Sequence, residues 1–176
     1  MRKSLAASAC AVLLGFLVLG TGFARQPDTG DRKLDSLLGK INKEAKADPE
    51  EFLKQLSLKH DIPEEEIRKA KEQHGLEPGD IYMATALARR TRRPIGDIAA
   101  EYKENQGKGW GVMAQSMGIK PGSPEFKELK DDARGSVDYM RAAKSRKHRE
   151  QALEKQRRQE NKGESQGKGL GKGKKK

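Results

Sequence analysis

The chain has 176 residues, of which 34% are hydrophobic and 36% are charged, and its formal net charge at pH 7 is +11. This composition is too polar for one compact core throughout, so we expect one small domain with extensions.

The first 24 residues, MRKSLAASACAVLLGFLVLGTGFA, have a basic start, an apolar middle and small residues at Gly22 and Ala24. This layout is typical of a secretory signal peptide, so we expect cleavage near Ala24 and a periplasmic or secreted protein. Because residues 4–24 carry no charge, an N-terminal membrane anchor is the alternative. The only cysteine, Cys10, would leave with the signal peptide, which excludes disulfides and thiolate sites from the mature protein.

The positive charge is concentrated in the C-terminal part of the chain. Residues 25–132 carry 20 basic and 21 acidic side chains, whereas residues 133–176 carry 15 basic and 5 acidic ones. The expected organisation is a signal peptide (1–24), a polar linker (25–30), an all-helical globular domain (31–132), a charged extension that is helical or solvated (133–162) and a disordered Lys/Gly-rich tail (163–176).

Apolar residues recur with helical spacing through the expected domain. The first stripe, at i, i+3, i+4 and i+7, consists of Leu34, Leu37, Leu38 and Ile41. Further helix starts are marked by Pro49, Pro63, Pro78, Pro94 and Pro124. No segment shows convincing strand alternation. We predict an all-α fold of about six or seven short helices in one small orthogonal or helical-hairpin domain, followed by a charged helical or disordered tail.

The stretch GKGWGVMAQSMGIKPGSPEF, from Gly107 to Phe126, surrounds the only tryptophan with glycines. It lacks the Gly-Lys-Ser/Thr ending of a phosphate loop, so we expect a structural role. Gly107 would end a helix, and Gly109 and Gly111 would let backbones approach closely where Trp110 enters the core. The same structural motif includes Gly118, Pro121, Gly122, Pro124 and Phe126.

Residues 110–130 also have some of the spacing of a helix-turn-helix, which gives the alternative function of a nucleic-acid-binding protein. Ala114, Gly118 and Ile119 occupy its small-residue, turn and first apolar positions. However, the turn IKPGSP is about two residues longer than usual. The second helix, PEFKELKDD, has four acids and two lysines where a DNA-reading helix favours Arg, Asn or Gln. A helical corner in the core is therefore the preferred interpretation.

Two groups of cations are candidate anion-binding residues. The first group, at a predicted helix C-terminus, is Arg89, Arg90, Arg92 and Arg93. Cations at this position also complement the carbonyl end of the helix, which is the simpler explanation. The second group, in the tail, is Lys168, Lys172, Lys174, Lys175 and Lys176.

Catalytic and metal-binding patterns find no support. The three histidines, His60, His74 and His148, are scattered along the chain. There is no set of nucleophile, base and orienting group, and no ligand cluster at zinc spacing. We expect a protein that is not an enzyme and that uses no metal or cofactor.

The segments AKADPEEF, EPGDIYMATALAR and KGWGVMAQSMGIKPGSPEF, between about Ala45 and Lys130, together with the Lys/Gly tail, resemble a group of small exported bacterial proteins of unknown function. The specific part is KGWG to GIKPGSPEF. Where that group often has a histidine after the phenylalanine, this chain has Lys127, which weakens a metal or acid–base role at that position. The resemblance implies a bacterial envelope protein and supplies no activity.

We therefore expect an exported binding module whose cationic tail associates with anionic polymers through electrostatics. Envelope glycopolymers, lipid head groups and extracellular nucleic acid are the candidate partners, and no specific protein partner is indicated. The simpler alternative is that the tail only aids solubility.

Overall fold

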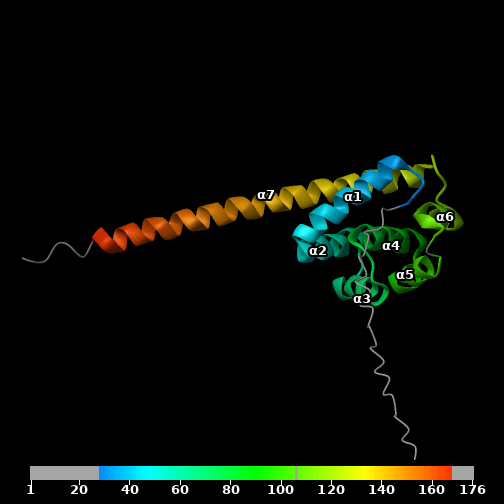
Figure 1. The fold of residues 1–176 in the computed structure, drawn as a ribbon, viewed down its shortest axis with the longest axis horizontal. Coiled ribbons are helices and arrows are strands. Elements are labelled where there is room, and N and C mark those ends of the chain that lie inside the picture. The colour runs from blue at the N-terminus through cyan, green and yellow to red at the C-terminus, as the bar shows by residue number, and fades with distance from the viewer. Residues whose placement is uncertain (1–27, 106, 168–176) are drawn as a thin grey trace, which may run out of the picture.

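The computed structural model describes residues 28–105 and 107–167, and this part of the chain forms seven α-helices and no strands (Figure 1). The helices are α1 (Arg32–Ala47), α2 (Pro49–His60), α3 (Glu64–His74), α4 (Pro78–Thr91), α5 (Ile95–Glu104), α6 (Gly109–Ser116) and α7 (Pro124–Gly167). The predicted all-α class is confirmed. The helix starts lie within one residue of the expected prolines, whose fixed φ suits the first turn of a helix.

The central element is α4, which contacts α1, α2, α3 and α5. In Figure 1, α1 and α7 lie on one side of it, and α3 and α5 lie on the other. From Pro78 to Ala88 every residue of α4 except Asp80 is buried. A helix that is mostly apolar all round is stable only when other elements cover it, and the short helices here supply that cover.

The start of α1 is fixed by hydrogen bonds between the residues just before the helix and its first turn. The carboxylate of Asp31 caps the helix by accepting from the backbone N–H groups of Lys33 (3.0 Å) and Leu34 (2.8 Å). Thr29, just before the cap, donates its backbone N–H and its hydroxyl to Asp35 at 2.8 and 2.7 Å. The segment before α1 is therefore held against the first turn.

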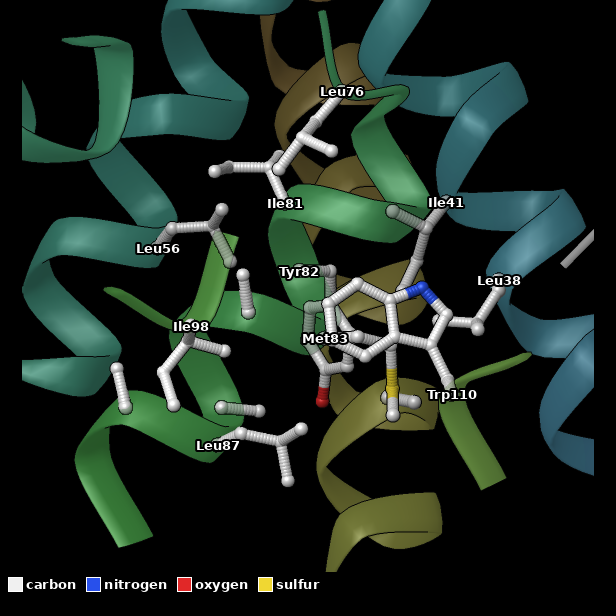
Figure 2. Close-up of a cluster of buried hydrophobic side chains, with 14 of the residues drawn as sticks. Leu38, Ile41, Leu56, Leu76, Ile81, Tyr82, Met83, Leu87, Ile98 and Trp110 are labelled. Atoms are coloured by element: carbon white, nitrogen blue, oxygen red, sulfur yellow. The ribbon is translucent and has the colours of Figure 1, made fainter. Parts of the chain in front are cut away.

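One hydrophobic core joins all seven helices. Its largest fully buried side chains include Trp110, Tyr82 and Phe52. Figure 2 shows Trp110 in the same cluster as Leu38 and Met83, so the tryptophan does enter the core as expected. Burying a side chain of this size stabilises the fold by roughly 1.5–3 kcal/mol, before cavity effects are counted.

The core extends beyond residue 132, where we placed the end of the domain. Ala133, Val137 and Met140 of α7 are buried, so the packed body includes the first part of the expected extension. The same helix then continues to Gly167, inside the segment that we expected to be disordered from residue 163. Its second half projects away from the body as a single helix (Figure 1).

Candidate polyanion-binding arm

The helices α1 and α7 run parallel, and ion pairs join them along their length. From the start to the end of α1, these pairs are Asp31 with Lys130 (3.0 Å), Glu44 with Arg141 (3.3 Å) and Asp48 with Lys147 (2.8 Å). Because α1 ends at Ala47, α7 continues without this neighbour after Lys147. We call residues 148–167, the part of α7 beyond its last ion pair with the body, the arm.

The side of α7 that faces α1 changes from apolar to basic where the two helices part. In the body, this side follows a spacing of three and four residues and consists of buried Phe126, Leu129, Ala133, Val137 and Met140. The same spacing continues through exposed Lys144, Lys147, Gln151, Lys155, Arg158 and Lys162. An apolar continuation would favour a coiled coil, whereas this one presents cations to solvent.

The exposed end of α7 carries more basic than acidic side chains. Between Arg141 and Lys162, α7 has nine Lys or Arg residues and three Glu residues. Arg141, Lys144 and Lys147 pair with Glu44 and Asp48 of the body, and the arm itself has five Lys or Arg residues and four Glu residues. Every residue from Lys144 to Lys162 is exposed. Within residues 28–105 and 107–162, no carboxylate lies within ion-pair distance of Arg149, Lys155 or Arg157.

Local pairs support the arm as a helix. Arg158 contacts Glu154 at 3.0 Å, and the side-chain amide of Gln156 donates to Glu160 at 3.2 Å. Both pairs have the i, i+4 spacing that stabilises an isolated helix by about 0.2–0.5 kcal/mol each. The sequence signal for the arm was the spacing of its basic residues, which continues the core stripe past Met140.

The arginine block at the end of α4 does not form one anion-binding clamp. The contacts are Arg89 with Asp61 (3.8 Å), Arg90 with Asp132 (2.7 Å) and Arg93 with Glu101 (2.8 Å). These acids lie after α2, in α7 and in α5, so the three guanidinium groups point to different neighbours. Arg92 ends α4 with a φ of +56° and is exposed, and it has no carboxylate partner in the part of the chain that the structure describes.

The glycines beside Trp110 allow the segment before α1 to cross α6. The backbone N–H of Trp110 donates to the carbonyl oxygen of Asp28 at 2.7 Å. A Cβ atom on Gly109 would lie 2.5 Å from that oxygen, and one on Gly111 would overlap the carbonyl oxygen of Thr29. The expected close approach of two backbones is confirmed, and its partner is the chain around Thr29.

The expected role of Gly107 is wrong, because α5 ends earlier. Its last residue is Glu104, and Asn105 caps it with a φ of −99°. Gly107 has a φ of +130° and lies in the turn that follows. A non-glycine residue rarely adopts this conformation, so Gly107 serves the turn rather than the helix end.

The turn between α6 and α7 makes a corner of the core. Gly118 and Gly122 have positive φ values of 85° and 83°, and Pro121 lies between them. Phe126 is buried against the body at the start of α7. The exposed residues on either side of Phe126 include Glu125 and Glu128, whose negative charge opposes contact with a DNA backbone. This region therefore offers little support for the helix-turn-helix alternative.

A second group of polar side chains lies where α2, α4 and α7 meet. The ammonium group of Lys59 donates to the backbone oxygen of Asp132 at 2.6 Å and to the hydroxyl oxygen of Ser136 at 3.3 Å. Arg90 donates to the carboxylate of Asp132 at 2.7 Å, and Gln55 donates to Ser136 at 3.0 Å. No local sequence pattern indicates this cluster, because its members come from three helices at least 31 residues apart, with Gln55 and Lys59 on α2 and Asp132 and Ser136 on α7.

This cluster has the electrostatics of a structural contact. Burial lowers the pKa of Lys59, and the neighbouring Asp132 opposes that shift. Burial would raise the pKa of Asp132, but Arg90 and Lys59 outweigh it and hold that pKa below its usual value. Ser136 is only 1% exposed, so its hydroxyl is closed to a substrate. The pairing of Lys59 with Asp132 also keeps that lysine from serving as a neutral base.

The three histidines do not meet in space. His60 is buried in α2, where burial, with a smaller effect of the Lys59 charge, lowers its pKa to about 4. His74 ends α3, and His148 is exposed on α7. Among the described residues, no group of three His, Cys, Asp or Glu side chains is placed to hold a metal ion.

Several expectations fall on residues outside the part of the chain that the structure describes. They concern the signal peptide at 1–24 and the tail lysines Lys168, Lys172, Lys174, Lys175 and Lys176. Within the described part, no helix has both the length and the apolar character needed to cross a bilayer. No family model matches the chain, and no curated protein or solved structure is significantly similar to it.

Proposed function

We propose that this protein is an exported, non-enzymatic binding module that associates with anionic polymers through the arm. The proposal assigns the packed body a supporting role. The body and the arm both have nearly equal numbers of acidic and basic side chains, and the arm differs in presenting Lys155, Arg158 and Lys162 at regular spacing on one side of an exposed helix.

The observation that carries this proposal is the change of the α1-facing side of α7 from apolar to basic. Glu44 and Asp48 of the body neutralise the first cations of this side, Lys144 and Lys147, and further along the side Arg158 pairs with Glu154 of α7 itself. Lys155, Arg158 and Lys162 follow on the exposed helix. From Lys155 to Lys162, a linear anion that lies along this side would meet a cation about every 4.5–6 Å, since each helical residue rises about 1.5 Å.

Salt-dependent binding to a polyphosphate of defined length tests the proposal. The full chain should bind at low ionic strength, and its affinity should fall steeply as salt is added, because binding releases counterions. The triple substitution Lys155→Gln, Arg158→Gln and Lys162→Gln should reduce the affinity by about tenfold or more. Its helix content should stay close to that of the parent, because these side chains are exposed.

A matched control removes the same charge from the body. Lys33, Lys40 and Lys43 are exposed on α1, and the triple change to Gln lowers the net charge by the same amount. We expect this control to change the affinity by less than about threefold. Equal losses in the two triple variants would mean that net charge alone drives binding, and the arm would not be the site.

The export part of the proposal needs its own measurement. We expect an extracytoplasmic protein whose intact mass lacks residues 1–24. A full-length protein in the cytoplasm would contradict export, and a full-length protein in the membrane fraction would identify residues 1–24 as an anchor.

A further inference from the structure

The exposed part of α7 carries its side chains in four strips, because successive helical residues turn by about 100°. The lysine strip is Lys144, Lys147, Gln151, Lys155, Arg158 and Lys162, and the arginine strip is Arg146, Arg149, Leu153, Arg157 and Glu160. On one side between them lies the amide strip, which is Ser145, His148, Ala152, Gln156 and Gln159. On the other side lies the acidic strip, which is Ala143, Glu150, Glu154 and Asn161.

The start of the acidic strip faces α2, and the amide strip is open beyond His148, which lines a hollow with Ala47, Asp48 and Glu51. Ala143 and Glu150 line a hollow of about 540 Å³ together with Glu51 and Lys54 of α2. The opposite side of α7 carries the amide strip, whose residues Ala152, Gln156 and Gln159 lie beyond the end of α1 and are exposed. A large ligand can therefore approach the arm from the amide side without meeting α2.

We propose that the polymer held by the arm is duplex DNA, with the amide strip directed into the major groove. An α-helix of about 10–12 Å diameter fits a groove about 12 Å wide, whose two walls are rows of phosphates. The lysine and arginine strips lie on the two sides of the amide strip and would each face one wall. Amide and small side chains suit the floor, where base edges offer hydrogen-bond donors and acceptors.

This inference rests on the proposed function and narrows it to one polymer. A polysaccharide or a polyphosphate that lies along α7 contacts only one basic strip, and the second strip would not contact the ligand. Duplex RNA has a major groove too deep and narrow for the helix. A helix that binds a lipid surface needs an apolar face, whereas Leu153 is the one large apolar side chain among residues 144–162 of α7.

Two substitutions that add the same charge on opposite strips test the orientation. Ala152→Glu places a carboxylate on the amide strip, and Asn161→Glu places one on the acidic strip. Both positions are exposed, and Glu is a good helix former at each. The measurement is binding of the full chain to a labelled 20-base-pair DNA duplex of mixed sequence at fixed salt.

We expect Ala152→Glu to weaken duplex binding by about tenfold, because its charge would face both phosphate rows. Asn161→Glu should weaken it by less than about threefold. The double change Arg149→Gln and Arg157→Gln should also weaken duplex binding, while binding of polyphosphate through the lysine strip should be nearly unchanged. Glu160 lies on the arginine strip, where its negative charge would face a phosphate row. Glu160→Gln should therefore strengthen duplex binding.

The outcomes separate this inference from the function on which it rests. Equal effects of Ala152→Glu and Asn161→Glu, with polyphosphate binding intact, would overturn groove binding and leave a polyanion-binding arm. Binding of a single strand as tight as that of the duplex would overturn it in the same way. If neither the duplex nor polyphosphate binds, both proposals fall.

Discussion

The indole N–H of Trp110 donates a hydrogen bond of 2.7 Å to the carboxylate of Asp80 and so joins α6 to the first turn of α4. The hydroxyl of Tyr102 donates to the same oxygen at 3.0 Å, and the two aromatic rings stack with centroids 3.9 Å apart. A helix of eight residues such as α6 is not stable alone. This contact, together with the crossing at Thr29, holds α6 on the body.

Replacing Asp80 with Ala should lower the free energy of unfolding by about 2 kcal/mol, because it leaves the buried indole N–H of Trp110 without its acceptor. Trp110 is the only tryptophan, so urea unfolding can be followed by its fluorescence, with a red shift expected in the folded variant. Asp97→Ala is the control, since Asp97 is an exposed acid in the first turn of α5. Equal losses in the two variants would show that the helix dipole, not the indole contact, accounts for the effect.

Gly111→Ala should destabilise the fold by several kcal/mol or prevent folding, because the new methyl group overlaps the carbonyl oxygen of Thr29. Gly96→Ala is the matched control. Gly96 lies inside α5 with no atom within 4 Å of a new Cβ atom, so this change should stabilise by up to about 1 kcal/mol. Thermal unfolding by circular dichroism compares the two. A Gly111→Ala protein as stable as the parent would mean that the chain around Thr29 does not cross α6.

His60 should make the fold less stable in mild acid. Its pKa is about 4 in the folded protein and near 6.5 when unfolded, so between these values the unfolded state binds more protons. The stability is therefore complete above about pH 6.5 and falls as the pH drops towards 4. We expect a loss of about 2 kcal/mol from pH 7.5 to pH 5.

The groups that act on His60 are Lys59, Arg89, Arg90 and Asp132. The first three stay cationic in this range, and the lowered pKa of Asp132 keeps it ionised. His60→Gln should therefore remove most of the loss between pH 7.5 and pH 5, measured by urea unfolding at both values. An unchanged loss in the variant would assign the pH dependence to other groups.

Asp132 should contribute to stability mainly because it neutralises two half-buried cations. Asp132→Ala leaves Lys59 and Arg90 without their counter-charge and should cost about 2–3 kcal/mol. Adding Lys59→Met should recover part of that loss, because it removes one of the uncompensated charges. Losses that simply add in the double variant would show that Lys59 and Asp132 are not coupled.

The helices could be predicted from the sequence because their starts are marked locally. Proline at Pro49, Pro78 and Pro124 fixes the first residue of a helix, and the stripe from Leu34 to Ile41 is buried as its spacing indicates. The end of the domain was harder to place. Val137 and Met140 are sparse in a charged segment, and their burial depends on the neighbouring α1 and α2.

The site was predicted less well, because its parts depend on partners that lie far away in the chain. The arginine block was a candidate anion site, with its place at a helix C-terminus as the simpler explanation, and the contacts of Arg89, Arg90 and Arg93 with separate acids show that it is not one clamp. No local pattern indicates those acids. The arm, by contrast, follows from spacing alone once Met140 is known to face the core, since Lys144 and Lys147 occupy the next positions of the same side.

The end of α1 at Ala47 also determines how far the protein extends from its own body. The arm has about 20 residues, of which only the first turn lies near α1 and α2, and at 1.5 Å each these residues form a rod of about 30 Å. Gly167, the last residue of α7, therefore lies at roughly one domain diameter from the packed helices. A ligand held at the end of α7 would be kept at a fixed distance from the body, and the length of the helix, rather than any contact with the body, would determine that distance.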